Sequence, residues 1–221
     1  MITIYGVPVS VHVRKPVVTA IAKGIEHKVE PVIPFDPPAN WASLSPTGLI
    51  PAMHDGDFSV AESAAICLYL ERKQPAPPIL PAGAREYSRV MFWDGYSGWL
   101  FRNLVQGLFL QKVLNPMIFK KAPDQSVIDK LLAEARPKIF GYLESSIDGK
   151  FLVGSALSLA DIGIVSNLIN YQYAGFTIDP PKYPKLSQYA DGIIALDPFR
   201  RALEREVPSA QQMGLDRTFL S

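Results

Sequence analysis

The stretch ITIYGVPVSVHVRKPVVTAIAKGIEHKVEPVI, residues 2–33, decides the fold. Its first four residues, 2–5, are β-branched or aromatic, which is typical of a short buried strand. Residues 11–24 then carry a helical pattern, because Ser10 stands where an N-cap stands and Gly24 stands where a glycine follows the last turn. The chain therefore opens with a strand that leads into a helix.

A second strand, HKVEPVI, is predicted at residues 27–33, although Pro31 weakens its hydrogen-bond ladder. Strand, helix and strand in this order imply a parallel pair joined by a right-handed crossover. Pro16 disturbs the helical pattern, because a proline inside a helix costs a hydrogen bond unless the helix begins near Val13.

A hairpin and a helix are predicted next. Residues 50–54 and 58–61 flank an Asp-Gly-Asp turn of the kind that joins antiparallel strands. A helical pattern follows from Ser63 to about Lys73. The segment PAPPILP, residues 75–81, can hold neither helix nor sheet and predicts a linker between domains.

After the linker the pattern changes to helices alone. They are predicted at residues 86–114, 124–146, 158–174 and 187–206. The sequence therefore predicts an α/β domain at 1–74, a linker at 75–85 and an all-helical domain at 86–221.

The charge balance excludes several classes of partner. The 221 residues carry 22 Lys and Arg against 21 Asp and Glu, a net charge of +1. This gives no electrostatic reason to expect nucleic acid or an anionic membrane as a partner.

No segment is apolar over the length that a membrane helix needs, and the first ten residues do not resemble a signal peptide. A cytoplasmic location is expected.

Cysteine and histidine usage excludes two kinds of chemistry. The single cysteine, Cys67, cannot form an intrachain disulfide or a CxxC pair, which disfavours a thioredoxin-type oxidoreductase. His12, His27 and His54 are scattered and lack the spacing of metal ligands, so no metal site is expected.

Several short segments share the order and spacing of one family. They are YGVPVSVHVRK at residues 5–15, SPTGLIP at 45–51, ESAAI at 62–66, SLAD at 158–161, YPKL at 183–186 and PFRRAL at 198–203. Together they resemble the cytosolic glutathione transferases, and among these the bacterial, serine-type members similar to the theta and nu classes. The resemblance runs from about residue 2 to 205. It implies a thioredoxin-like first domain, an all-helical second domain, and Ser158 with Asp161 as a capping box that serves folding.

The resemblance implies glutathione as the co-substrate and Ser10 as the catalytic residue. The thiolate of glutathione is the nucleophile, and the Ser10 hydroxyl would donate a hydrogen bond to its sulfur. Free amides and the positive end of the helix dipole would assist. Two alternatives stay open: Ser10 is only an N-cap, or Tyr5 supports the thiolate.

The other glutathione contacts also follow from the resemblance. A cis bond before Pro51 would turn the N–H and C=O of Ile50 toward the cysteinyl backbone of the ligand, like an added strand. Ser63 would hold the γ-glutamyl carboxylate at a helix start, and Glu62 would accept the ammonium group. Many relatives carry a lysine where this chain has Leu49, which weakens the site for the glycyl carboxylate.

Other basic and polar residues near the site have weaker roles. Asn40 and Trp41 are the only other candidates for that carboxylate. Arg14 and Lys15 predict a solvated face or a local ion pair rather than ligand contacts.

The electrophile pocket is predicted on the long helix, where Tyr96, Trp99 and Asn103 recur at i, i+3 and i+7. The alternative is that this stripe belongs to the core. The resemblance also implies a homodimer, with the first domain of each copy packed on the second domain of the other.

Two functions stay open at this stage. The first is an enzyme that joins glutathione to a small hydrophobic electrophile, with glutathione-dependent peroxide reduction as an added activity. The second is a binding or protein-interaction module of the same fold without turnover. The combination of Ser10, Ile50-Pro51 and Glu62-Ser63 favours the enzyme.

Overall fold

Four strands form one mixed sheet in the order β2-β1-β3-β4 in this computed structural model, which describes residues 1–220. β1 (Ile2–Tyr5) pairs in parallel with β2 (His27–Glu30) and antiparallel with β3 (Ala52–Asp55). β4 (Phe58–Ala61) completes the hairpin with β3. The predicted parallel pair and the predicted hairpin are confirmed.

Three helices belong to the first domain: α1 (Val11–Ala22), α2 (Trp41–Leu44) and α3 (Ser63–Lys73). The helix predicted from Ser63 to Lys73 is confirmed. α1 begins at Val11 and not near Val13, with Pro16 inside it. Short α2 was not predicted.

The ends of α1 and β2 have local causes. Gly24, at φ 65°, closes α1, with its own amide donating to Ile21 and the next amide, that of Ile25, to Ala20. β2 ends at Glu30 because Pro31 has no N–H to extend the ladder.

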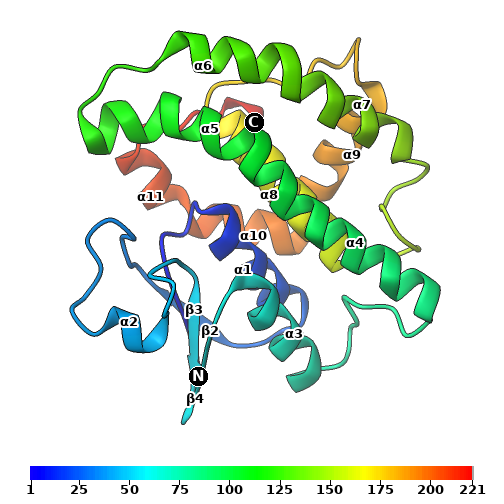
Figure 1. The fold of residues 1–221 in the computed structure, drawn as a ribbon. Helices are drawn as coiled ribbons and strands as arrows, with labels where there is room; N and C mark the ends of the chain where they lie inside the picture. The colour runs from blue at the N-terminus through cyan, green and yellow to red at the C-terminus, as the bar shows by residue number, and fades with distance from the viewer. Residues whose placement is uncertain (221) are drawn as a thin grey trace.

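The second domain is helical throughout and lies above the sheet in Figure 1. One long helical run comprises α4 (Ala84–Leu100), η1 (Phe101–Val105), α5 (Gln106–Phe109) and η2 (Leu110–Phe119), of which η1 and η2 are π-helical. It is followed by α6 (Gln125–Lys130), π-helical η3 (Leu131–Ala135), α7 (Arg136–Ser146), α8 (Leu159–Tyr173), α9 (Pro184–Ile194), α10 (Asp197–Arg205), α11 (Val207–Gln212) and the 3-10 turn η4 (Thr218–Leu220).

Two predicted helices differ from the structure. The long helix continues beyond residue 114 to Phe119, because π-helical turns carry it through Pro116. The helix predicted at 187–206 is two helices, and the second starts at Asp197 with Pro198 in its first turn, where a proline is tolerated.

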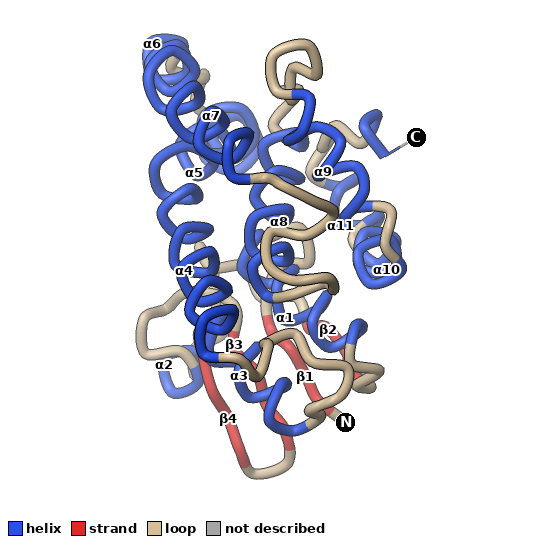
Figure 2. Tube along the Cα trace, turned by 90° about the vertical axis from the view of Figure 1, so that its right-hand side faces the viewer, coloured by secondary structure: helices blue, strands red, loops and turns tan. Residues whose placement is uncertain are grey.

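α8 is the centre of the helical domain. All its residues are buried, and it packs against both α4 and α1, as Figure 2 shows. Its start is held by Asp161, whose carboxylate accepts hydrogen bonds from Ser158, from the Leu152 amide and from the Tyr189 hydroxyl. The predicted capping box of Ser158 and Asp161 is therefore present.

The segment between the domains contains no helix or strand from residue 74 to residue 83. It includes a cis peptide bond between Ala76 and Pro77, which was not predicted. The boundaries at residues 74 and 86 stay a prediction. Among residues 1–220, no helix has the length and apolar character needed to cross a membrane.

Candidate functional site

Strand register brings three chain segments to one end of the sheet. Tyr5 pairs with Ala52, and Ala52 pairs with Ala61. The residues after Tyr5, before Ala52 and after Ala61 therefore lie side by side. Gly6 shows how tight this edge is, because a Cβ atom there would lie 3.0 Å from Cβ of Ile50 and 2.6 Å from a methyl of Val13.

Ser10 lies at this edge, at the start of α1. Its own carbonyl accepts hydrogen bonds from the amides of Val13 and Arg14, so its main chain begins the helix. Its hydroxyl makes no hydrogen bond to any residue that the structure describes. The side chain is therefore not a helix cap here, and the hydroxyl is free to donate to a ligand.

The first amides of α1 are also uncommitted. Within residues 1–220, the N–H groups of Val11 and His12 have no hydrogen-bond acceptor. They stand at the positive end of the helix dipole, beside the Ser10 hydroxyl. This end of α1 can stabilise an anion such as a thiolate.

Tyr5 is the rival of Ser10. It ends β1, and its ring lies edge-on against Trp41 with the ring centroids 6.2 Å apart. It packs on a small apolar cluster of Val32, Trp41 and Ala52. These contacts give the ring a packing role.

The bond between Ile50 and Pro51 is cis, so this prediction is confirmed. Pro51 accepts a hydrogen bond from the Glu62 amide at 3.2 Å. In the described chain the N–H and C=O of Ile50 have no main-chain or side-chain partner. They can therefore pair with an extended peptide laid along the edge.

Glu62 and Ser63 face the same edge. Glu62 has φ 81°, an unfavourable conformation for a residue with a side chain, and such conformations concentrate at functional sites. Its side chain is exposed, whereas Ser63 is 4% exposed. Across residues 1–220 neither side chain makes a hydrogen bond, so the Ser63 hydroxyl and the Glu62 carboxylate are both available.

The segment that would face the glycyl carboxylate carries no charge. Leu49 is 59% exposed, and its carbonyl is held by the Ser45 hydroxyl at 2.7 Å. The indole N–H of Trp41 donates to the carbonyl of Gly48 at 3.1 Å. Two residues were candidates for binding this carboxylate. The N–H of Trp41 is already used in the bond to Gly48, whereas Asn40 is exposed.

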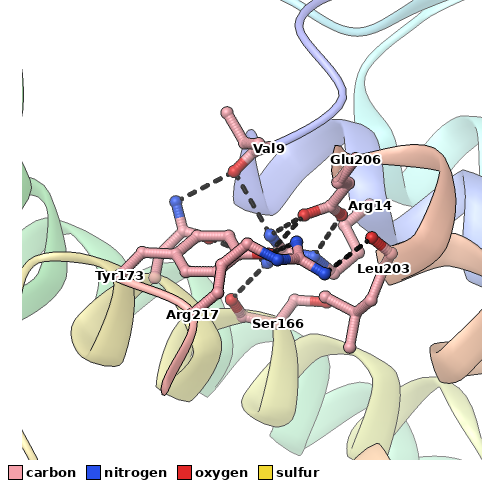
Figure 3. A network of polar contacts seen from close by, with 8 residues as sticks. Val9, Arg14, Ser166, Tyr173, Leu203, Glu206 and Arg217 are labelled. Atoms are coloured by element: carbon pink, nitrogen blue, oxygen red, sulfur yellow. Dashed lines mark hydrogen bonds and ion pairs between the residues drawn. The ribbon is translucent and has the colours of Figure 1, made fainter. Parts of the chain in front are cut away.

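Arg14 and Lys15 are buried, which corrects the predicted solvated face. Lys15 pairs with Asp94 of α4 at 2.6 Å, and Arg14 pairs with Glu206 at 2.7 Å. The alternative prediction was a local ion pair. Both residues do form ion pairs, but with partners far away in the sequence. Figure 3 shows Arg14 within a polar network that includes Val9, Ser166, Tyr173 and Glu206.

Tyr96 and Trp99 touch each other on one face of α4, with ring centroids 5.3 Å apart. Tyr96 also meets Tyr142 of α7 at 5.2 Å, and burial raises the pKa of Tyr96 to about 12. Asn103 donates to the Trp99 carbonyl at 2.8 Å. Tyr96 and Trp99 therefore share a face of α4, Asn103 follows in η1, and the pocket role of all three stays a prediction.

A different residue of the long helix meets α1. The ring of Phe101 lies edge-on to that of His12, with the ring centroids 4.5 Å apart. His12 is two residues after Ser10. Burial, together with the charges of Lys15 and Arg102, lowers the pKa of His12 to about 4, so the imidazole is neutral at pH 7. The sequence analysis did not predict this pair. The position of His12, two residues after Ser10, was the signal that could have pointed to it.

No group of three or more His, Cys, Asp or Glu side chains that could hold a metal occurs within residues 1–220. Cys67 is buried against Thr19, and burial raises the pKa of its thiol to about 11.

Comparison with known proteins agrees with this geometry. Residues 4–78 match the family "Glutathione S-transferase, N-terminal domain", and residues 109–200 match "Glutathione S-transferase, C-terminal domain". The fold is the one these families share, a thioredoxin-like sheet domain followed by an all-helical domain.

Individual relatives cover most of the chain. A glutathione S-transferase of Triticum aestivum is 28% identical over 94% of this chain and 95% of its own. Glutathione S-transferase theta-1 of Homo sapiens is 30% identical over 74% of this chain and 70% of its own. The human T1-1 structure in the apo form is 25% identical, with a TM-score of 0.81 over 99% of this chain and 95% of that one.

A solved glutathione S-transferase of Rhodospirillum rubrum matches the fold with a TM-score of 0.85, at 24% identity over 92% of both chains. The chain belongs to the glutathione S-transferase family. Membership implies glutathione as the co-substrate, and the similar proteins include theta and zeta classes.

Proposed function

We propose that the chain is an active, serine-type glutathione transferase, similar to the theta and nu classes, that joins the glutathione sulfur to a hydrophobic electrophile. The observation that carries this proposal is the unbonded Ser10 hydroxyl at the start of α1, beside two unbonded amides. A side chain that served only as a helix cap would have its hydroxyl engaged.

Glutathione would lie along the edge of the sheet. Ser63 and the start of α3 receive its γ-glutamyl carboxylate, and Glu62 receives its ammonium group. The free N–H and C=O of Ile50 pair with the cysteinyl backbone. In this pose the thiol would lie at the amino end of α1.

Ser10 then donates its hydroxyl hydrogen to the sulfur and stabilises the thiolate, whose proton is lost to solvent. The amides of Val11 and His12 add positive potential at the same point. The thiolate attacks the electrophile, a carbon–sulfur bond forms, and the leaving group departs with the electron pair of its bond.

Peroxide reduction belongs to the same proposal. The thiolate would attack a peroxide oxygen and release an alcohol, and a second glutathione would reduce the resulting sulfenic acid to give the disulfide and water. Both reactions depend on Ser10 in the same way.

The non-catalytic module is supported by one observation, the exposed and uncharged Leu49 where a cation would hold the glycyl carboxylate. Weak binding of glutathione would favour this alternative.

We further propose a cytoplasmic homodimer. Exposed aromatic rings support self-association: Phe92 is 51% exposed, and Trp99 and Tyr142 are each 42% exposed. With Tyr96 between them, these rings form what we call the aromatic patch of α4 and α7.

The test is glutathione conjugation to a generic aryl halide, measured side by side for wild type and Ser10→Ala, with glutathione binding measured by calorimetry on both. We expect wild type to turn over and the variant to bind glutathione while losing most of its activity. Equal turnover would transfer the role to Tyr5 or to the amides. Wild type that binds no glutathione would overturn the proposal in favour of the module.

A further inference from the structure

The carbonyl oxygen of Val9 accepts hydrogen bonds from two side chains. Asn170 of α8 donates its Nδ2 at 3.1 Å, and Arg14 donates its Nη2 at 3.3 Å. Val9 is 2% exposed, so no solvent competes for this oxygen. Figure 3 shows the Val9 carbonyl pointing into the network around Arg14.

The same peptide group is held on its other side. The amide of Ser10 donates to the carbonyl of Val7 at 3.0 Å. The peptide plane between Val9 and Ser10 is therefore fixed at both its oxygen and its nitrogen. Together with φ of Ser10, which is −69°, the orientation of this plane sets the direction of the Cα–Cβ bond of Ser10, from which the hydroxyl projects.

This restraint on the main chain matters because no hydrogen bond within residues 1–220 holds the Ser10 hydroxyl itself. It makes no hydrogen bond within the described chain, so only the main chain directs it. A hydroxyl that must meet a sulfur atom at hydrogen-bond distance depends on such direction.

The two donors are themselves held by further hydrogen bonds and an ion pair. Oδ1 of Asn170 accepts from Nη1 of Arg14 at 2.8 Å, which sets which way the amide of Asn170 faces. Arg14 is fully buried, and its other hydrogen bonds go to the Glu206 carboxylate and the carbonyl of Ser166. All three guanidinium nitrogens therefore have acceptors, and such charge-assisted hydrogen bonds hold the side chain in one orientation.

We propose that Asn170 is a positioning residue for Ser10, acting through the carbonyl of Val9. This inference rests on the proposed function. It assigns to α8, the central helix of the second domain, a part in the thiolate site of the first.

The chain offers a matched control. Asn167, one turn earlier on α8, is 1% exposed, and its Nδ2 donates to the carbonyl of Ser97 in α4 at 3.2 Å. It also donates to Gly163 at 2.9 Å. It is therefore a buried asparagine whose Nδ2 also donates to main-chain carbonyls, but to those of α4 and α8 rather than to that of Val9.

The experiment compares Asn170→Leu and Asn167→Leu in the full chain. The pKa of the thiol of bound glutathione is measured from the ultraviolet absorbance of the thiolate against pH, with kcat and KM for glutathione. We expect Asn170→Leu to raise this pKa by about one unit and to lower kcat roughly tenfold to hundredfold, with little change in KM. Asn167→Leu should leave the pKa unchanged. Asn170→Asp, which keeps the shape and loses the donor, gives the same readout if the leucine variant does not fold.

A double variant completes the test. Since Asn170 acts through Ser10, adding Asn170→Leu to Ser10→Ala should raise the thiol pKa no further than Ser10→Ala alone. If wild type ionises glutathione and Asn170→Leu and Asn170→Asp leave the thiol pKa unchanged, the inference is overturned while the proposed function stands. If wild type binds no glutathione, both are overturned.

Discussion

Arg14 and Glu206 form a two-point ion pair, with Nε 2.7 Å from Oε1 and Nη2 2.8 Å from Oε2. The arginine side chain is completely buried, and the carboxylate is nearly so. Burial alone would lower the pKa of Arg14, but the carboxylate of Glu206 raises it above its ordinary value. This pair ties the first helix of the sheet domain to the C-terminal segment of the helical domain.

Glu206→Ala leaves the guanidinium buried without its carboxylate. We expect the free energy of unfolding to fall by about 3–5 kcal/mol, the range for breaking a buried pair on one side. Urea unfolding measures this. Asp197→Ala is the control, because Asp197 pairs with Arg200 and Arg201 at the surface and should cost no more than about 0.5 kcal/mol. A loss below about 1 kcal/mol for Glu206→Ala would contradict the assignment.

Ser63→Ala should weaken glutathione binding and spare stability. The hydroxyl has no partner in the described chain, so its removal breaks no internal hydrogen bond. Loss of a hydrogen bond to the ligand carboxylate should raise the Kd for glutathione roughly tenfold to hundredfold, as calorimetry measures. Ser59→Ala on the exposed hairpin removes only a surface hydrogen bond to His54, so it should leave the Kd unchanged and alter stability by no more than about 0.5 kcal/mol. An unaltered Kd for Ser63→Ala would remove Ser63 from the binding site.

Leu49→Lys should tighten glutathione binding. An exposed cation near the glycyl carboxylate is worth about 0.2–1 kcal/mol, so the Kd should fall roughly 1.5-fold to fivefold, and less at high salt. Glutathione with its glycyl carboxylate esterified is the control ligand and should show no gain. An equal gain for the ester would mean that Leu49 does not face that end of the ligand.

Trp99→Ala and Phe101→Ala separate two surfaces of the long helix. Trp99 belongs to the exposed aromatic patch, so its loss should weaken the dimer in sedimentation equilibrium. Phe101 meets His12 beside Ser10, so its loss should raise KM for the electrophile. The opposite pattern would support the electrophile wall predicted at Tyr96, Trp99 and Asn103.

His12 should make the fold sensitive to mild acid. Its pKa is about 4 in the folded chain against 6.5 ordinarily, so between these values the unfolded state binds more protons. The free energy of unfolding should therefore fall as the pH is lowered from about 6.5 to 4. Urea unfolding at pH 7, 5.5 and 4.5 should show a smaller decline for His12→Gln than for wild type.

A second histidine acts in the same direction, because burial also lowers the pKa of His27. His27→Gln measures how much of the decline in the free energy of unfolding comes from His27. If the decline is the same in His12→Gln as in wild type, His12 is not the group responsible.

Local patterns predicted the parts of the fold that local chemistry determines. Ile2–Tyr5, the glycine after α1, the Asp-Gly-Asp hairpin and the helix starting at Ser63 all have signals within a few residues. The cis bond before Pro51 came from the resemblance, because most X-Pro bonds are trans.

The long helix shows where periodicity fails. A π-helical turn adds a residue without starting a new turn, so the 3.6-residue pattern changes phase at Phe101. A stripe extrapolated from Tyr96 to Asn103 therefore did not identify Phe101, which contacts α1.

The network around Arg14 had no signal in the sequence. Arg14 and Glu206 are 192 positions apart, and adjacent Arg and Lys residues are ordinarily typical of a surface. Only the packing of α1 against α8 and α10 shows that these charges are internal.

The Arg14 ion pair also bears on how the chain is made. Arg14 is synthesised 192 residues before Glu206. Until Glu206 is made, the first domain therefore holds a cation whose native partner does not yet exist. Since an unpaired guanidinium resists burial, we expect α1 to reach its final position only after Glu206 has been synthesised. A fragment limited to the sheet domain would stay at that unfinished stage.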